Sequence, residues 1–149
     1  MSKRLSEAAD SEIQAPGTIS VQSPDGLSAE LDVVESGPVG VILERLRVKG
    51  PPDDLTRRAA DVARTIRPGG ASLTPIEVDP RLGGATLRSP VDRQRRFYEA
   101  EVTEDAVELT RSTVGEDGTR VPAEFSLTRE GLSEILDGIE DVMLPEEDG

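Results

Sequence analysis

Arginine is the residue type in this sequence best suited to binding another molecule. Fifteen of the seventeen cationic residues are arginine, whose planar guanidinium makes paired hydrogen bonds to a carboxylate or a phosphate. Ten cations form three groups along the chain, and we take them as the candidate binding residues: Arg45, Arg47 and Lys49; Arg57, Arg58, Arg64 and Arg67; and Arg93, Arg95 and Arg96.

Catalytic chemistry has few candidate side chains. The chain has no histidine and no cysteine, so it lacks the commonest general base, any thiol nucleophile and the usual ligands of structural zinc. Its glycine-rich segments lack the Lys-Ser/Thr pair of a phosphate-binding loop, and no twelve-residue calcium loop is present. We therefore predict no catalytic residue, no metal site and no cofactor, and we expect that the protein is not an enzyme.

Carboxylates are numerous, and their positions favour structural roles. Asp53 and Asp54 stand at the start of a predicted helix, and either carboxylate can accept hydrogen bonds from its free N–H groups. Glu99, Glu101 and Glu108 are expected on one face of a hairpin, where opposed carboxylates would raise a pKa. We interpret this face as a solvated outer surface on which hydration removes most of that effect.

The charge is distributed unevenly along the chain. Residues 1–43 carry a net charge of −5, residues 44–96 carry +5 and residues 97–149 carry −13. The total of −13 repels a polyanion at long range and disfavours tight nucleic-acid binding. The basic middle segment has three interpretations: a local binding patch, a complement to the acidic part of another copy, or ordinary solvated surface.

Two periodicities predict the elements that must position these residues. Apolar and polar residues alternate in eight segments, which predicts eight β-strands at about 18–22, 27–33, 39–48, 73–78, 85–89, 97–102, 107–110 and 121–127. In the third segment we expect Arg45, Arg47 and Lys49 to share a face with Val41 and Leu43, opposite Ile42, Leu46 and Val48.

Apolar residues at helical spacing predict two amphipathic helices, at 53–67 and 128–143. Pro68-Gly69-Gly70 ends the first helix. Gly131 and Gly138 lie inside the second, where each costs about 0.5–1 kcal/mol relative to alanine. Either another backbone approaches closely at these glycines or the helix tolerates them.

The predicted architecture is an α+β domain: an antiparallel sheet of about eight strands with two packed amphipathic helices. We expect residues 18–144 to form this single domain and residues 145–149 to form an acidic tail. Residues 1–17 are predicted to be a flexible arm, with a short docking helix as the alternative. No segment is apolar enough to be a membrane helix or a secretory signal, so we expect a soluble cytoplasmic protein.

Two stretches resemble known families. The segment Val107–Met143, with a hairpin, then Ala123-Glu124-Phe125-Ser126-Leu127-Thr128, then a helix, resembles single-stranded-DNA-binding transcriptional coactivator and whirly-type domains, although it is acidic where their strands are basic. The element order of residues 18–89 is similar to that of small dimeric secretion chaperones, which bind an extended segment of a partner, although extra strands follow here at 96–126. We assign the chain to neither family.

These observations favour a non-enzymatic protein-binding or adaptor module. A chaperone-like role and a homodimer are both compatible with this interpretation. Its partner is then another protein or a second copy of the chain, and no membrane is involved. The alternative is a nucleic-acid-binding domain that uses the arginine-rich middle segment.

Overall fold

The computed structural model describes residues 4–144, which form one antiparallel sheet of nine strands and three α-helices. The predicted α+β class is therefore confirmed. In chain order the elements are α1 (Leu5–Glu12), β1 (Gly17–Gln22), β2 (Ser28–Ser36), β3 (Gly40–Lys49), α2 (Leu55–Thr65), a short 3-10 helix (Pro68–Gly70), β4 (Thr74–Asp79), β5 (Gly84–Arg88), β6 (Arg96–Thr103), β7 (Ala106–Val114), β8 (Arg120–Ala123), β9 (Phe125–Thr128) and α3 (Arg129–Met143).

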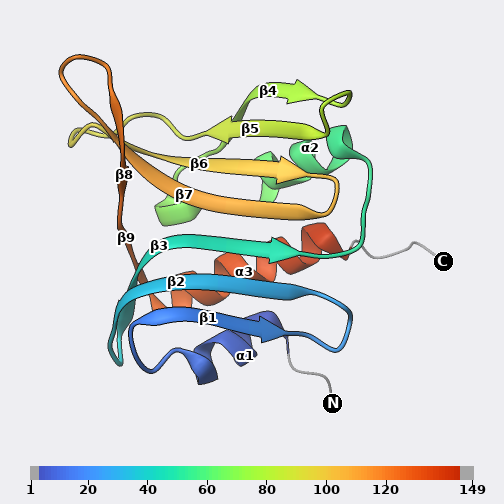
Figure 1. The fold of residues 1–149 in the computed structure, drawn as a ribbon, viewed down its shortest axis with the longest axis vertical. Helices are drawn as coiled ribbons and strands as arrows, with labels where there is room; N and C mark the ends of the chain where they lie inside the picture. The colour runs from blue at the N-terminus through green and yellow to red at the C-terminus, as the bar shows by residue number, and fades with distance from the viewer. Residues whose placement is uncertain (1–3, 145–149) are drawn as a thin grey trace.

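Seven strands form a continuous path in the order β1-β2-β3-β7-β6-β5-β4. The other two, β8 and β9, come from the single strand predicted at 121–127, which is interrupted at Glu124. Strand β8 pairs with the C-terminal half of β7, whereas β9 pairs with the N-terminal half of β3. The sheet therefore divides at one end, and β8 and β9 connect its two halves (Figure 1).

A β-bulge in β3 decides which face each of its residues occupies. Leu43 pairs with Val33 and Arg45 pairs with Asp32, so Glu44 has no partner on β2. The extra residue changes the alternation, and Val41, Leu43, Leu46 and Val48 are all buried. The predicted face for Val41 and Leu43 was therefore wrong, because a period-2 pattern cannot show a bulge.

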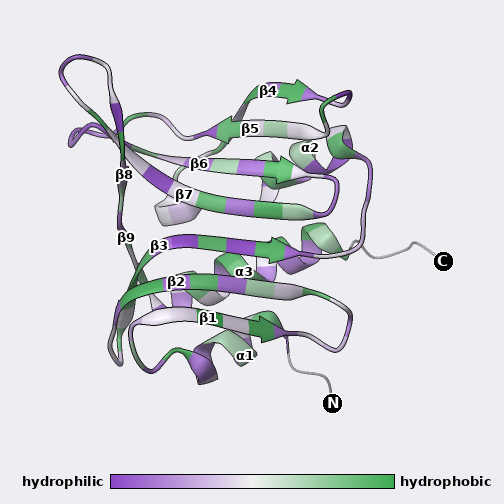
Figure 2. Ribbon diagram, viewed as in Figure 1, coloured by the Kyte–Doolittle hydropathy of each residue, from purple (hydrophilic) through white to green (hydrophobic). Residues whose placement is uncertain are grey.

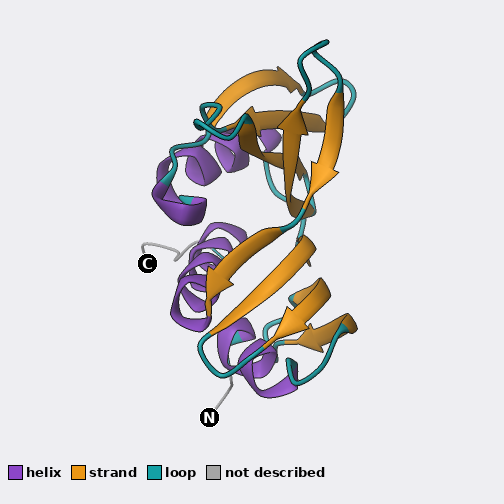
Figure 3. Cartoon of the chain, turned by 90° about the vertical axis from the view of Figure 1, so that its left-hand side faces the viewer, coloured by secondary structure: helices purple, strands orange, loops and turns teal. Residues whose placement is uncertain are grey.

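All three helices lie on one face of the sheet, and the core lies between them and the strands (Figure 3). Helix α2 packs on β4, β5 and β6, whereas α3 contacts β3, β9 and α1. Figure 2 shows the resulting alternation of hydrophobic and hydrophilic residues along β3 and β7. Among the described residues, no helix has the length and apolarity needed to cross a membrane.

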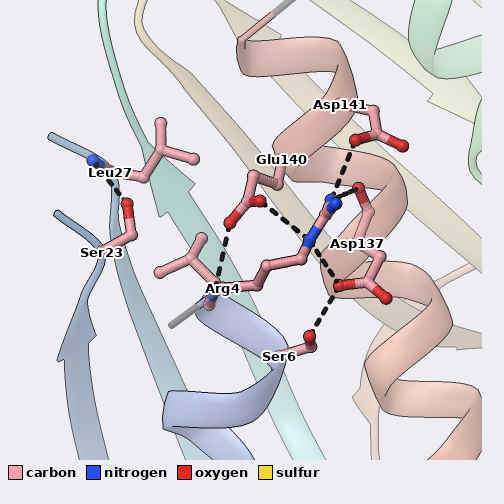
Figure 4. A network of polar contacts seen from close by, with 8 residues as sticks. Arg4, Ser6, Ser23, Leu27, Asp137, Glu140 and Asp141 are labelled. Carbon is pink, nitrogen blue, oxygen red and sulfur yellow. Dashed lines mark hydrogen bonds and ion pairs between the residues drawn. The ribbon is translucent and has the colours of Figure 1, made fainter. Parts of the chain in front are cut away.

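Helix α1 is packed against the rest of the molecule. From residue 4 onward the N-terminal segment is therefore a short docking helix and not a flexible arm. Its Leu5 and Ala9 are buried in the core, as is the following residue Ile13. Figure 4 shows how Arg4 forms ion pairs with three carboxylates of α3, at 3.2, 2.9 and 2.9 Å from Asp137, Glu140 and Asp141. The predicted acidic tail at 145–149 lies outside the described residues.

The two helix glycines have different environments. A Cβ atom on Gly138 would lie 2.9 Å from Ile66 Cδ1 and 3.9 Å from the Thr65 carbonyl oxygen, so α3 packs on the end of α2 here, and the closest contact is with the Ile66 side chain and not with backbone. The Gly131 N–H donates to Thr128 Oγ1 at 2.8 Å, which caps α3. At the start of α2, Asp54 accepts from the Arg57 N–H, as predicted for a cap.

Candidate binding surface on the open sheet face

The side chains that alternate with the core residues project from the face of the sheet that carries no helix within residues 4–144. We call this surface the open face. The strand registers and burial patterns place the following side chains on it: Ser20 and Gln22 of β1; Ser28, Glu30 and Asp32 of β2; Arg45, Arg47 and Lys49 of β3; Glu108 of β7; Phe97, Glu99 and Glu101 of β6; Thr86 and Arg88 of β5; and Arg120 of β8.

Acidic and basic strands adjoin across the open face, and the two acidic strands β7 and β6 are neighbours. Strand β2 contributes acids, β3 contributes bases, β7 and β6 contribute acids, and β5 contributes a base. Opposite charges on neighbouring strands attract each other across about 5 Å. The result is a surface whose charges are ordered by the sheet itself.

Arg45 is the central ion-pairing residue of this surface. Its guanidinium contacts Glu30, lies 3.2 Å from Asp32 and lies 3.1 Å from Glu108, so it links β2, β3 and β7. Partial burial alone would lower the pKa of Arg45, but Asp32, Glu108 and Glu30 outweigh it and raise the pKa. Arg45 therefore stays charged and is held in one position.

A second cluster fixes the acid on β6. Glu99 Oε2 accepts hydrogen bonds from Arg88 and Arg120, each at 2.7 Å. Both guanidinium groups also lie over the ring of Phe97, at 5.8 and 5.2 Å from its centroid, within the range of a cation–π contact. Glu99 is buried as a result, which corrects our expectation that its carboxylate is simply solvated.

Glu101 has carboxylate neighbours on both sides. It lies directly opposite Glu108 in the register and follows Glu99 on the same face, and its carboxylate accepts from Thr86 Oγ1 at 3.0 Å. The residue is exposed, yet partial loss of hydration raises the pKa of its carboxyl. The Thr86 hydrogen bond acts in the opposite direction, but a hydrogen bond with Glu99 and the charges of Glu99 and Glu108 keep the pKa raised. We had expected hydration to remove the effect of opposed carboxylates, but at Glu101 this effect remains.

The structure does not bring the three predicted groups of cations together. Of the ten cations predicted as binding residues, Arg45, Arg47 and Lys49 are the ones that lie on the open face. In the second group, Arg64 pairs with Asp61 at 2.9 Å and Arg57 lies 4.0 Å from Asp61, both on the helix side of the sheet. Beyond α2, the Arg67 guanidinium donates to Ser72 Oγ at 3.3 Å.

Arg58 has a structural role. It is only 1 % exposed, and its guanidinium donates to the carbonyl oxygens of Glu104 and, at 3.0 Å, Pro51. Burial lowers its pKa, while the charges of Asp53 and Asp105 act in the opposite direction. The residue thus joins the start of α2 to the β6–β7 turn and is no part of an accessible surface.

The third group lies at the β5–β6 connection. Arg96 is 3.7 Å from Asp92, a carboxylate that also pairs with Arg111 at 3.1 Å. Arg95 has a φ of 63°, and its guanidinium donates to the Gly115 carbonyl oxygen at 3.5 Å. Arg93 is exposed.

Our sequence reasoning missed several members of the open face, namely Glu30, Asp32, Arg88 and Arg120. The period-2 pattern gives the face of each residue within one strand, and it could have indicated Glu30 and Asp32 beside Arg45. The pairing of β3 with β7 spans about sixty residues, and no local pattern predicts such a contact. The positions of Glu108 beside Arg47 and of Glu101 beyond it on β6 could therefore not be predicted from the sequence.

Two hollows of more than 500 Å³ lie away from the cations of the open face. One of about 630 Å³ lies between the α1–β1 connection, the β2–β3 hairpin and β9, and Glu35 is its ionisable lining residue. Another of about 510 Å³ lies between the end of α2 and the start of α3, lined in part by Arg67 and Glu134. Neither gathers the several acids or arginines that a catalytic cleft would need.

Comparison with known proteins gives no relative: no family model matches the chain, and neither the curated proteins nor the solved structures contain a significant match.

Proposed function

We propose that this protein is a non-enzymatic protein-binding module and that the open face is its contact surface. The observation that carries the proposal is the set of ordered acids and bases on adjoining strands of a sheet face that no helix covers in the described chain. Charges already fixed by neighbours lose little freedom on binding, and complementary charges provide specificity and speed of association.

The same pattern disfavours the alternative of nucleic-acid binding. A phosphate backbone is contacted best by an uninterrupted basic surface, whereas Arg45 and Arg47 have carboxylates on both neighbouring strands. The other arginine groups lie on the helix side or in a loop and do not extend the basic strip on β3.

A second copy of the chain is among the partners that this surface suits. It carries both acidic and basic strands, so the acids of β2, β7 or β6 in one copy can face the bases of β3 or β5 in another. Light scattering at micromolar concentration distinguishes a monomer of 16.0 kDa from a particle of twice that mass.

The proposal is tested by affinity purification from the native cell with three forms of the chain. These are the natural sequence, an open-face variant with Arg47→Glu and Lys49→Glu, and a control with Arg57→Glu and Arg64→Glu. The control makes the same change of charge on the helix side. We expect the natural chain and the control to retain the same proteins, and the open-face variant to lose them at least fivefold while its circular dichroism is unchanged.

Two results would contradict this assignment. One is an open-face variant that retains every partner. The other is co-purification of nucleic acid that moderate salt releases, together with binding of the purified protein to an isolated oligonucleotide with a steep salt dependence.

A further inference from the structure

A small hollow at one end of the open face has a composition that suits an anion. It has a volume of about 230 Å³ and lies over β1, β2 and β3. Its polar side chains are Ser20, Gln22, Ser28, Glu30, Arg47 and Lys49. Five of these six can donate a hydrogen bond.

The two cations of this hollow have no carboxylate partner within residues 4–144. Glu30 and Glu108 are the carboxylates opposite Arg47 in the register, but both pair with Arg45. Lys49 lies opposite Ser28 and Ala106, which carry no charge. The three ion pairs of Arg45 therefore leave Arg47 and Lys49 available to an incoming group.

The spacing of these cations matches an extended peptide. Arg47 and Lys49 are two residues apart on one strand face, which separates them by about 6.6 Å. Carboxylates at alternate positions of an extended segment have the same separation. The hydroxyls of Ser20 and Ser28 and the amide of Gln22 lie beside the cations, where they can complete the hydrogen bonding of a carboxylate.

A polyanion fits this site less well than one or two carboxylates. Glu30 lines the hollow, and the column formed by Glu108, Glu101 and Glu99 begins on the adjacent strand β7. A nucleic-acid strand that leaves the hollow across the sheet meets those acids, and the net charge of −13 opposes its approach.

We infer that this hollow binds the carboxylates of an acidic, extended segment of a partner protein, with Arg47 and Lys49 as the charged contacts. The inference rests on the proposed function and defines the chemistry of one part of the same surface. It identifies Ser20, Gln22 and Ser28 as additional contacts.

Titration of the full-length 15N-labelled chain with a short probe tests the site by NMR. The probe is the peptide Glu-Thr-Glu with acetyl and amide ends, and Gln-Thr-Gln with the same ends is its control. We expect saturable shifts of the amides of Ser20, Gln22, Ser28, Arg47 and Lys49 with the first peptide, and at least tenfold weaker binding of the second.

Two variants make the test specific. Arg47→Gln with Lys49→Gln should weaken binding of the acidic peptide at least tenfold, whereas Arg57→Gln with Arg64→Gln should leave it unchanged. Equal shifts with both peptides, shifts confined to other parts of the chain, or the absence of saturation would overturn the inference. A thymidine oligonucleotide that binds the same amides more tightly than the peptide would also overturn it, in favour of a phosphate site.

Failure of this experiment is distinguishable from failure of the proposed function. If the peptide does not bind but the open-face variant still loses its cellular partners, the open face is a contact surface whose partner uses other chemistry. If both experiments fail, the open face is solvated surface.

Discussion

Arg47 and Val48 are neighbours on β3, but they lie in different environments. Val48 faces the helices and is completely buried, whereas Arg47 faces outward beside a small hollow. On the covered face, stability comes from removing aliphatic surface from water, at about 25 cal/mol per Å². On the open face the ion pairs of Arg45 are partly exposed and screened by water, so each contributes at most about 1 kcal/mol.

This difference separates stability from binding. A substitution on the covered face should lower the free energy of unfolding without changing the contact surface itself. A substitution on the open face should change the recognition surface and leave the fold intact. The following substitutions test that separation, beginning with the largest expected effect.

Phe125→Ala probes the covered face at a completely buried ring. Phe125 packs edge-on against Tyr98, with ring centroids 5.8 Å apart. We expect a loss of about 3–5 kcal/mol in the free energy of unfolding, measured by urea denaturation. A loss below about 1 kcal/mol would show that β9 is not packed as described.

Arg58→Ala tests whether an arginine on the helix side behaves as core. The variant leaves the carbonyl groups of Glu104 and Pro51 without their donor, so we expect a loss of about 2–3 kcal/mol in unfolding free energy. The neighbouring Arg57→Ala is the matched control and should change stability by less than about 0.5 kcal/mol. Equal effects of the two substitutions would contradict the buried role of Arg58.

Arg45→Ala measures how much the open face contributes to folding. Three ion pairs are lost, and Glu30, Asp32 and Glu108 are left without their shared cation. We expect a loss of about 1 kcal/mol at low salt. Because these charges are partly exposed, the difference from the natural chain should shrink at about 1 M salt; a difference that salt does not change would argue against an ion-pair origin.

Glu101→Gln should have the smallest effect, and the size of this effect depends on pH. The folded state raises the pKa of Glu101, so it holds this proton more tightly than the unfolded chain does. The contribution of Glu101 to stability therefore falls as the pH rises through the folded pKa. We expect Glu101→Gln to stabilise the protein by a few tenths of a kcal/mol at about pH 7, and the gain to disappear at a pH below the ordinary glutamate range.

The pH dependence is measured by thermal unfolding of both chains across this range. Thr86→Val is the companion variant, because it removes the hydroxyl that donates to Glu101 without changing the charge. Destabilisation by Glu101→Gln at neutral pH would show that the carboxylate is stabilised by its surroundings and would contradict the raised pKa.

Local features of the fold were predictable, and long-range ones were not. The helices α2 and α3 follow from apolar residues at helical spacing, and the start and end of α2 also follow from Asp54 and Pro68. Helix α1 was ambiguous because its apolar positions are few; burial of Leu5 and Ala9 in the core holds it in place, together with the ion pairs of Arg4 with α3, more than 130 residues away. Tertiary contacts of this kind leave no signal in a local window.

The candidate surface shows the same division. Arg45, Arg47 and Lys49 could be placed on one strand face from their spacing alone. Arg58 was misassigned because a helical pattern does not show which polar residue the tertiary structure buries. The bulge at Glu44 and the β3–β7 pairing determine which charges meet, and both arise from packing of the whole sheet.

The most direct test of the open face as a contact surface is site-specific photo-crosslinking in the native cell. A photoreactive residue replaces Ser20 on the open face in one chain and Arg64 on α2 in another; both side chains are exposed. We predict that the chain labelled at position 20 forms a discrete covalent complex with a protein and that the chain labelled at position 64 does not. Crosslinks only from position 64, or from neither position, would contradict a binding role for this face.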